Sequence, residues 1–284
     1  MSLKHHLDHF LDTFPRERHV EMDPVQFVHR FSEPADREVV GFVAAALSYG
    51  NVVSVLRIVD AIVERMGDHP AEFVSRFEPR RDARIFRGLY HRWNSDTDVV
   101  VLLWILRRMV EEHGSLQSVV AEEMAVWDGS VGVALDRFSA IALNLGHEQF
   151  YRKNELGKRR GVRYFFPRVS DGSACKRLNL FMRWMVRADD GVDCGVWNRI
   201  TPDRLVIPLD THITRISRYI GLTELHSPGW SMAQDITDSL RRLNPSDPLK
   251  YDFALCHLGI AGDCPKKRNA VKCRKCPIQA VCRL

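Results

Sequence analysis

The chain has 284 residues, enough for one large domain or two lobes, and its apolar and charged fractions, 45% and 27%, are typical of a soluble globular protein. It contains no run of eighteen apolar residues, and its N-terminal residues lack the apolar centre of a signal peptide. These features argue against a membrane protein or a secreted one, and we expect a cytoplasmic protein. The net charge of +5 is compatible with a nucleic-acid partner and also with an enzyme that acts on anionic substrates.

Apolar residues recur at helical spacing along most of the chain. In the first half, four stretches combine this spacing with glycine or proline near the end: 36–50, 51–70, 95–114 and 129–146. Four more stretches of this kind follow in the second half: 173–191, 211–222, 231–244 and 247–262. No convincing alternation of apolar and polar residues and no internal repeat occurs, so the pattern predicts an all-α fold.

The segment 152–172 differs from the predicted helices, because it is basic, aromatic and interrupted by glycines. Long connections in compact domains are often functional. This segment is either a solvated surface loop or a contact for phosphate groups, and its place beside the catalytic candidate described below favours the second. The predicted phosphate contacts are Lys158, Arg159, Arg160 and Arg163.

The last twenty-one residues hold four of the seven cysteines, with the spacing C-x8-C-x2-C-x5-C: Cys264, Cys273, Cys276 and Cys282. Four thiolates in a short segment can hold one metal centre. Structural zinc commonly uses two tight cysteine pairs, whereas only one pair is tight here. This favours a 4Fe-4S cluster, in which each sulfur reaches a different iron, over structural zinc or unligated thiols. The other three cysteines are predicted to be small buried residues: Cys175, Cys194 and Cys256.

Asp210 precedes a predicted helix in the stretch PLDTHITRI, residues 208–216. A carboxylate at this position can cap the helix, because it accepts hydrogen bonds from the first backbone amides. It can also be held ready for chemistry, since the helix dipole favours its charged form. The two roles are compatible, because the cap fixes the direction of the carboxylate.

The stretch Leu209–Asp210–Thr211–His212 stands about fifty residues before a four-cysteine terminus in a helical chain. In this it resembles the endonuclease III family of base-excision DNA glycosylases, and more broadly the helix–hairpin–helix glycosylase superfamily. That family has its catalytic aspartate in a V/L-D-T-H stretch and a cluster pattern of C-x6-C-x2-C-x5-C. The chain has the last two cysteine spacings and two more residues in the first. The resemblance is firm over residues 205–284 and looser over 36–150.

The chain departs from this family in one feature, because the family's hairpin of the L-P-G-V-G-x-x-T-A type is absent. The nearest lysine that opens a predicted helix upstream of Asp210 is Lys176, thirty-four residues before it. This gap is similar to that of the archaeal 8-oxoguanine glycosylase branch. The resemblance therefore implies Lys176 as the nucleophile that forms a Schiff base with the sugar. It implies Asp210 as the carboxylate that stabilises the cationic sugar and assists proton transfer.

The implied function is a base-excision DNA glycosylase with AP lyase activity on double-stranded DNA, with oxidised guanine as a candidate lesion. The damaged base must leave the stack and enter a pocket. Rough alignment gives three candidates for its wall, Tyr49, Asn51 and Trp93, each of which can instead be a core or capping residue. His212 is a fourth candidate for the pocket, with an ordinary helix residue as the alternative. Basic residues near the cysteines are expected to contact phosphates or to be solvated charge around the cluster: Lys266, Lys267, Arg268, Lys272, Arg274 and Lys275.

The resemblance also implies a monomer of two helical lobes, with Lys176 and Asp210 at the cleft between them. One lobe is 36–205 with the basic loop 152–172, and the other is 1–35 plus 206–284 with the cysteine loop 264–282. A competing hypothesis is a non-catalytic nucleic-acid-binding protein that keeps the scaffold and the cluster. A third, an unrelated helical redox protein, is weaker because nothing indicates a flavin or nicotinamide site. The first two hypotheses differ in whether Lys176 and Asp210 face one cleft.

Overall fold

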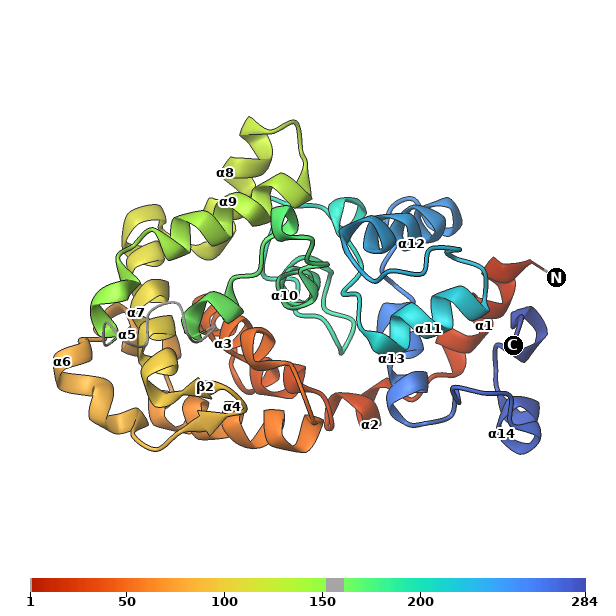
Figure 1. Cartoon of the computed structure of the whole chain (residues 1–284), viewed down its shortest axis with the longest axis horizontal. Coiled ribbons are helices and arrows are strands. Elements are labelled where there is room, and N and C mark those ends of the chain that lie inside the picture. Colours follow the sequence, from red (N-terminus) through yellow and green to blue (C-terminus); the bar gives the residue numbers. More distant parts are fainter. Residues whose placement is uncertain (1, 152–160) are drawn as a thin grey trace.

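The computed structural model of the chain describes residues 2–151 and 161–284, which are mostly helical, as the periodicity predicts (Figure 1). The first helices are α1 (Leu3–Thr13), α2 (Arg16–Val20), α3 (Pro34–Leu47), α4 (Val52–Met66), α5 (Pro70–Ser75), α6 (Pro79–Asp82), α7 (Asp96–His113), α8 (Leu116–Val126) and α9 (Val131–Leu143). The later helices are α10 (Lys176–Val186), α11 (Thr211–Tyr219), α12 (Trp230–Leu243), α13 (Asp252–Ile260) and α14 (Ala270–Lys275). The short 3₁₀ helices used below are η1 (Pro24–Arg30), η2 (Ala83–Phe86) and η7 (Gln279–Val281).

Helix α3 is buried on all sides, with every residue from 38 to 47 inaccessible to solvent. It packs against α10 and η1. Gly41 permits this close packing, because a Cβ atom at that position would lie 2.8 Å from Cε of Met185 on α10. The absence of a side chain at one residue of α3 therefore fixes where α10 lies, and α10 carries Lys176 at its first position.

The predicted helix ends agree with the structure where capping residues are present. Helix α7 begins after a capping box, in which the Ser95 side chain and the Asp98 side chain satisfy each other's backbone amides. It ends at Gly114, whose φ of 82° favours glycine. The helix expected over 247–262 is shorter, because it begins at Asp252.

Several elements were not predicted, among them the helices α5, α6 and α8 and a hairpin of two antiparallel strands, β1 (Tyr90–His91) and β2 (Asn94–Ser95). Its turn is made by Arg92 and Trp93, and Arg92 has a φ of 58°. Each strand has two residues, too few for alternation of apolar and polar side chains to show in the sequence. The side chain of the buried Asn94 then ties the hairpin to the rest of the fold by a hydrogen bond to the carbonyl of Gly161.

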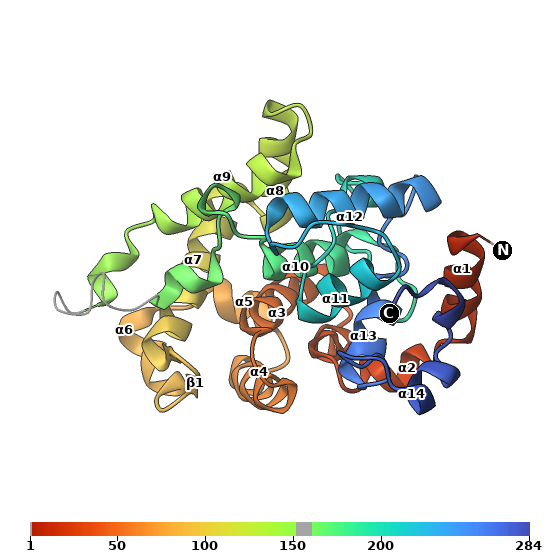
Figure 2. The ribbon, with the colours of Figure 1, turned by 45° about the vertical axis from the view of Figure 1, so that its right-hand side comes forward.

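The first helix packs against the C-terminal part of the chain, and both termini lie at the same end of the molecule (Figures 1 and 2). Asp8 on α1 accepts hydrogen bonds from Lys250, at 2.7 Å, and from the Tyr251 hydroxyl, at 2.6 Å. Helix α1 also contacts η7, which lies among the C-terminal cysteines. Within the described ranges, every helix is too short or too polar to cross a membrane.

Candidate functional site

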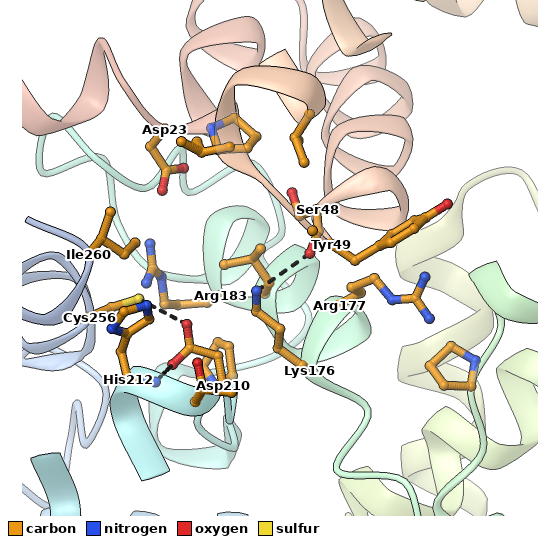
Figure 3. Close-up of a pocket in the computed structure, with 18 of the residues that line it drawn as sticks. Asp23, Ser48, Tyr49, Lys176, Arg177, Arg183, Asp210, His212, Cys256 and Ile260 are labelled. Carbon is orange, nitrogen blue, oxygen red and sulfur yellow. Dashed lines mark hydrogen bonds between the residues drawn. The ribbon is translucent and has the colours of Figure 1, made fainter. Parts of the chain in front are cut away.

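A cavity of about 1200 Å³ collects polar side chains from segments that are far apart in the sequence (Figure 3). Its wall is formed by the start of η1, the connection from α3 to α4, the turn before α10, and facing parts of α10, α11 and α13. Both catalytic candidates predicted from the sequence, Lys176 and Asp210, line this cavity. Three of the four predicted pocket residues line it as well: Tyr49, Asn51 and His212.

Lys176 is the first residue of α10, and its amine donates a hydrogen bond to the carbonyl of Ser48 at 3.4 Å. The residue before it, Cys175, has a φ of 48°, a left-handed conformation that is costly for any residue except glycine. Two hydrogen bonds hold this turn: the Cys175 amide donates to Oγ of Ser173, and its buried thiol donates to the carbonyl of Pro167. The turn therefore fixes Lys176 at the helix start, facing the C-terminal end of α3.

Asp210 caps α11, as predicted. Its Oδ1 accepts hydrogen bonds from the amides of His212, at 2.8 Å, and Ile213, at 2.7 Å. Its Oδ2 accepts a hydrogen bond from the thiol of Cys256 on α13, at 3.4 Å. Both oxygens are thus held from different elements, and Figure 3 shows the carboxylate on the wall of the cavity that also receives Lys176.

The charges of Lys176 and Asp210 act on one imidazole in this cavity, that of His212. Burial is the largest cause that lowers the pKa of His212; Asp210 opposes this shift, while Arg215 and Lys176 add to it. The ring of His212 packs directly on α13, because a Cβ atom at Gly259 would lie 2.6 Å from its Cβ and Nδ1. His212 is therefore neutral at pH 7 and serves as the packing contact between α11 and α13.

The aromatic side of the cavity is built around Tyr49. Its ring stacks on Trp93, with centroids 5.2 Å apart, and meets Tyr164 edge-on at 4.7 Å. Arg177 covers the Tyr164 ring at 3.8 Å. Trp93 is not among the lining residues and contributes by supporting Tyr49. Asn51 both lines the cavity and caps α4, because its side chain accepts the amide of Val53.

The sequence analysis missed polar residues on α13 and α10 that line the cavity. Asp252 and Cys256 are four residues apart on the otherwise apolar helix α13, so they share one face. Polar residues at this spacing within an apolar helix were the available signal. Asp23 was also missed; its carboxylate pairs with His257 at 3.1 Å. Cys256 was predicted to be a small buried residue, but it is half-buried, and its thiol donates a hydrogen bond to Asp210. Cys175 and Cys194 are buried, as predicted.

Asp252 and Arg183 form a buried ion pair at the base of the cavity. Burial raises the pKa of Asp252 to about 6, although the neighbouring Arg183 opposes the shift. Arg183 also pairs with the buried Asp193 at 3.0 Å. Oδ1 of Asp252 and Nη2 of Arg183 have no hydrogen-bond partner among the described residues. Since an unpaired buried carboxylate oxygen is costly, this geometry acts with burial to raise the pKa of Asp252.

Of the basic residues predicted to contact phosphates, Arg163 is exposed and lines the cavity. Arg168, which was not predicted, lines it too. Lys158, Arg159 and Arg160 lie outside the described residues. The basic residues near the cysteines are all exposed: Lys266, Lys267, Arg268, Lys272, Arg274 and Lys275.

The four C-terminal cysteines come from different local elements. Cys264 follows α13, Cys273 lies in α14, Cys276 ends α14, and Cys282 follows η7. Burial raises the pKa of Cys264 and of Cys276, and neighbouring thiols add to each shift, those of Cys282 and Cys273 in the case of Cys264. The backbone amide of Asn269 donates to Sγ of Cys273 at 3.5 Å. In residues 2–151 and 161–284, no three His, Cys, Asp or Glu side chains are grouped closely enough to hold a metal ion.

A family model described as "Protein of unknown function (DUF2400)" matches residues 23–261. The chain belongs to the DUF2400 family. The match begins at Asp23, includes every residue that lines the cavity except Met22, and ends before the first cysteine of the C-terminal segment. No curated protein and no solved structure matches the chain.

Proposed function

We propose that this DUF2400 protein is a base-excision DNA glycosylase with AP lyase activity, built as a member of the helix–hairpin–helix glycosylase superfamily. The observation that carries the proposal is that Lys176 and Asp210 line one cavity, each fixed at the start of its own helix. A nucleophilic amine and a carboxylate on the wall of one cavity are what a Schiff-base mechanism needs. The residue before Lys176 is in a strained conformation, which adds support because such strain is often found at functional sites.

In the proposed reaction the amine of Lys176 attacks C1′ of the deoxyribose, and the base leaves from the same carbon with its bonding electrons. Asp210 stabilises the positive charge that develops on the sugar, because its carboxylate is already oriented by two backbone amides and a thiol. The C1′–O4′ bond then breaks as the nitrogen forms a double bond to C1′, and a proton from the attacking nitrogen passes to O4′, which gives the Schiff base. Loss of a proton from C2′ then permits elimination of the 3′ phosphate. The carbonyl of Ser48, which accepts a hydrogen bond from the amine, positions Lys176 for the attack.

The proposed substrate is double-stranded DNA with a damaged base, oxidised guanine being the candidate lesion. The base would stack in the cavity against Tyr49, supported by Trp93, with Asn51 and His212 on the same wall. Arg163 and the basic residues of the C-terminal segment would contact phosphates. The proposed monomer has the two lobes 36–205 and 1–35 plus 206–284, with the cavity in the cleft between them and a location in the cytoplasm.

The C-terminal segment is proposed to hold a 4Fe-4S cluster through Cys264, Cys273, Cys276 and Cys282, with structural zinc as the alternative. Four thiols in one short segment are the donors that such a group takes, and a backbone amide donates to one of them, Sγ of Cys273. In the described residues no three such side chains are close enough to hold a metal ion, so the proposal rests on the kind and number of the donors and not on their geometry. A cluster there would supply structural support and DNA docking. Analysis of the purified protein for iron, acid-labile sulfide and zinc separates the two metals, with about four irons per chain expected for the cluster.

The decisive experiment is borohydride trapping on DNA duplexes that contain an abasic site or 8-oxoguanine. Wild type is compared with Lys176→Ala, and with Lys4→Ala as a control that removes an exposed lysine on α1. We expect a covalent protein–DNA adduct with wild type and with Lys4→Ala, and none with Lys176→Ala. An adduct that persists in Lys176→Ala would place the nucleophile elsewhere. DNA binding without any adduct would favour the non-catalytic nucleic-acid-binding protein.

A further inference from the structure

A second cavity, of about 480 Å³, lies at the α6 end of the molecule, opposite the end that holds α14 (Figures 1 and 2). It is formed by α6, η2, the start of α7 and the residues Gln149 and Phe150. It shares no lining residue with the cavity of Lys176 and Asp210. Its volume is in the range of sites that bind small molecules or parts of larger ligands.

Three arginines line this second cavity: Arg80, Arg84 and Arg87. They are four and three residues apart along the consecutive turns of α6 and η2, which places them on one face. All three are exposed, and none of them forms an ion pair with an acidic residue in the part of the chain that the structure describes. The wall of the cavity also contains the carboxylate of Asp96, so its lining carries three positive charges and one negative charge.

The nearest acidic residues are already engaged. Asp82 binds its neighbour Arg81 through both oxygens, each at 2.7 Å, and accepts the amide of Glu78. Asp96 accepts the amides of Gly88, at 2.9 Å, and Thr97, at 2.8 Å. Hydrogen bonds from backbone amides orient these carboxylates without removing their charge. Within the described residues neither forms an ion pair with one of the three arginines, so the cavity keeps an excess of positive charge.

The rest of the wall fits a ligand that has phosphate groups beside apolar surface. Thr97 and Gln149 add neutral hydrogen-bond donors. Val100 and Phe150 supply an apolar surface, and Phe150 is held by an aromatic contact with Trp104 at 5.0 Å. Arginine suits phosphate because its planar guanidinium can donate two parallel hydrogen bonds to two phosphate oxygens.

We propose that the second cavity binds consecutive phosphates of a nucleic-acid strand, as an anchoring site separate from the catalytic cavity. Arg80 and Arg87 are seven residues apart, which corresponds to about 10–14 Å along these turns. Each strand of a DNA duplex carries one phosphate per about 3.4 Å of helix axis, so each arginine can reach a different phosphate of the same strand. The proposal shares with the proposed function the nucleic-acid partner, but it does not depend on the chemistry of Lys176.

The test measures binding of the full-length protein to an undamaged, end-labelled DNA duplex and to the corresponding single strand over a series of salt concentrations. The variant is the triple substitution Arg80→Ala/Arg84→Ala/Arg87→Ala. The control is Arg76→Ala/Arg137→Ala/Arg241→Ala, which removes the same charge from arginines that pair with acidic residues and line neither cavity. A nucleoside triphosphate and an acidic peptide are used as competitors.

We expect the dissociation constant of the cavity variant to rise at least about tenfold on the duplex. The slope of log affinity against log salt should fall by about 2.7, because three phosphate contacts are lost and each contributes about 0.9. The control should change the dissociation constant less than about threefold. Equal losses in the two triple variants would overturn the proposal, as would competition by the acidic peptide at equal charge concentration. Strong competition by the nucleoside triphosphate would assign the cavity to a free nucleotide and would also overturn the strand-binding proposal.

The outcome is distinguishable from failure of the proposed function. If the cavity variant loses affinity while wild type forms no borohydride adduct on any lesion, the anchoring site stands and the glycosylase proposal fails. If wild type forms the adduct and the cavity variant binds DNA like the control, the glycosylase proposal stands and the anchoring site fails. A thermal unfolding curve of each variant shows that a loss of affinity is not a loss of folding.

Discussion

The thiol of Cys256 donates a hydrogen bond to Oδ2 of Asp210, so α13 holds the same carboxylate that caps α11 (Figure 3). This hydrogen bond affects both groups. It orients the Asp210 carboxylate toward the cavity, and the negative charge of that carboxylate disfavours ionisation of the Cys256 thiol. Burial is the largest cause that raises the pKa of Cys256 well above its ordinary value, and Asp210 is the next.

The first prediction concerns the reactivity of this thiol. Because only the thiolate reacts, we expect iodoacetamide at pH 8 to alkylate Cys256 at least about tenfold more slowly than free cysteine. In Asp210→Asn the negative charge is lost, so the rate at Cys256 should rise severalfold. Mass spectrometry of the peptide that contains Cys256 gives the rate. Asp171→Asn, at the rim of the same cavity, is the control and should leave the rate unchanged; equal rates in wild type and Asp210→Asn would contradict the prediction.

The second prediction separates the two roles of Asp210. Asparagine caps a helix about as well as aspartate, so Asp210→Asn should change the free energy of unfolding by less than about 0.5 kcal/mol. Asp210→Ala loses the cap and should cost about 0.5–2 kcal/mol. Both variants lack the carboxylate charge, and the proposed base excision should fall by about 100-fold or more in each. Urea unfolding and single-turnover excision measure the two effects. An active Asp210→Asn would reduce Asp210 to a cap.

The helices were predictable from the sequence because their signals are local. The apolar spacing and end residues of α3, α4, α7 and α9 depend on residues within one or two turns, and each of these helices has close to its predicted ends. The hairpin at residues 90–95 was not predictable, because it is held by Tyr49 and Asn94, which are distant in sequence from their partners. Short strands of this kind depend on tertiary contacts.

The residues of the candidate site also differ in whether the local sequence marks them. Lys176, Asp210 and His212 could be named because a helix start and a short motif mark them in the sequence. Cys256 and Asp252 are marked in the sequence only as polar residues on one face of an apolar helix. Their partners, and the role of Arg183, depend on contacts of α13 with α11 and α10. Nothing in the stretch DFALCHLGI reveals that one face of this helix meets an aspartate forty-six residues earlier.

The third prediction tests that packing. A Cβ atom at Gly259 would lie 2.6 Å from Cβ of His212, so Gly259→Ala forces α11 away from α13. We expect a loss of about 1–3 kcal/mol in the free energy of unfolding and a lower rate of excision, because Asp210 moves with α11. In a His212→Gly background the clash disappears, and the same Gly259→Ala substitution should cost less than about 1 kcal/mol. Additive losses in the double variant would show that His212 does not limit the approach of the helices.

The fourth prediction follows from the buried carboxyl of Asp252. Its pKa is about 6 in the folded protein, against an ordinary value of 3.8. As the pH rises through this interval, Asp252 ionises first in the unfolded chain, which lowers the free energy of the unfolded state relative to the folded one. The contribution of the protonated Asp252 to the free energy of unfolding is therefore fully present below pH 3.8 and is lost as the pH approaches and passes 6. The difference of about two pH units corresponds to about 3 kcal/mol at 1.36 kcal/mol per unit.

Asp252→Asn removes this titration while it keeps a neutral side chain of the same shape beside Arg183. Its stability relative to wild type should therefore improve by up to about 3 kcal/mol between pH 4 and pH 7. Urea unfolding of both proteins at several pH values measures the difference. If the free energies of unfolding of wild type and Asp252→Asn run parallel with pH, Asp252 ionises at the same pH in the folded and the unfolded protein. In that case the ion pairs of Arg183 with Asp252 and Asp193 fully offset the cost of burying the Asp252 carboxylate.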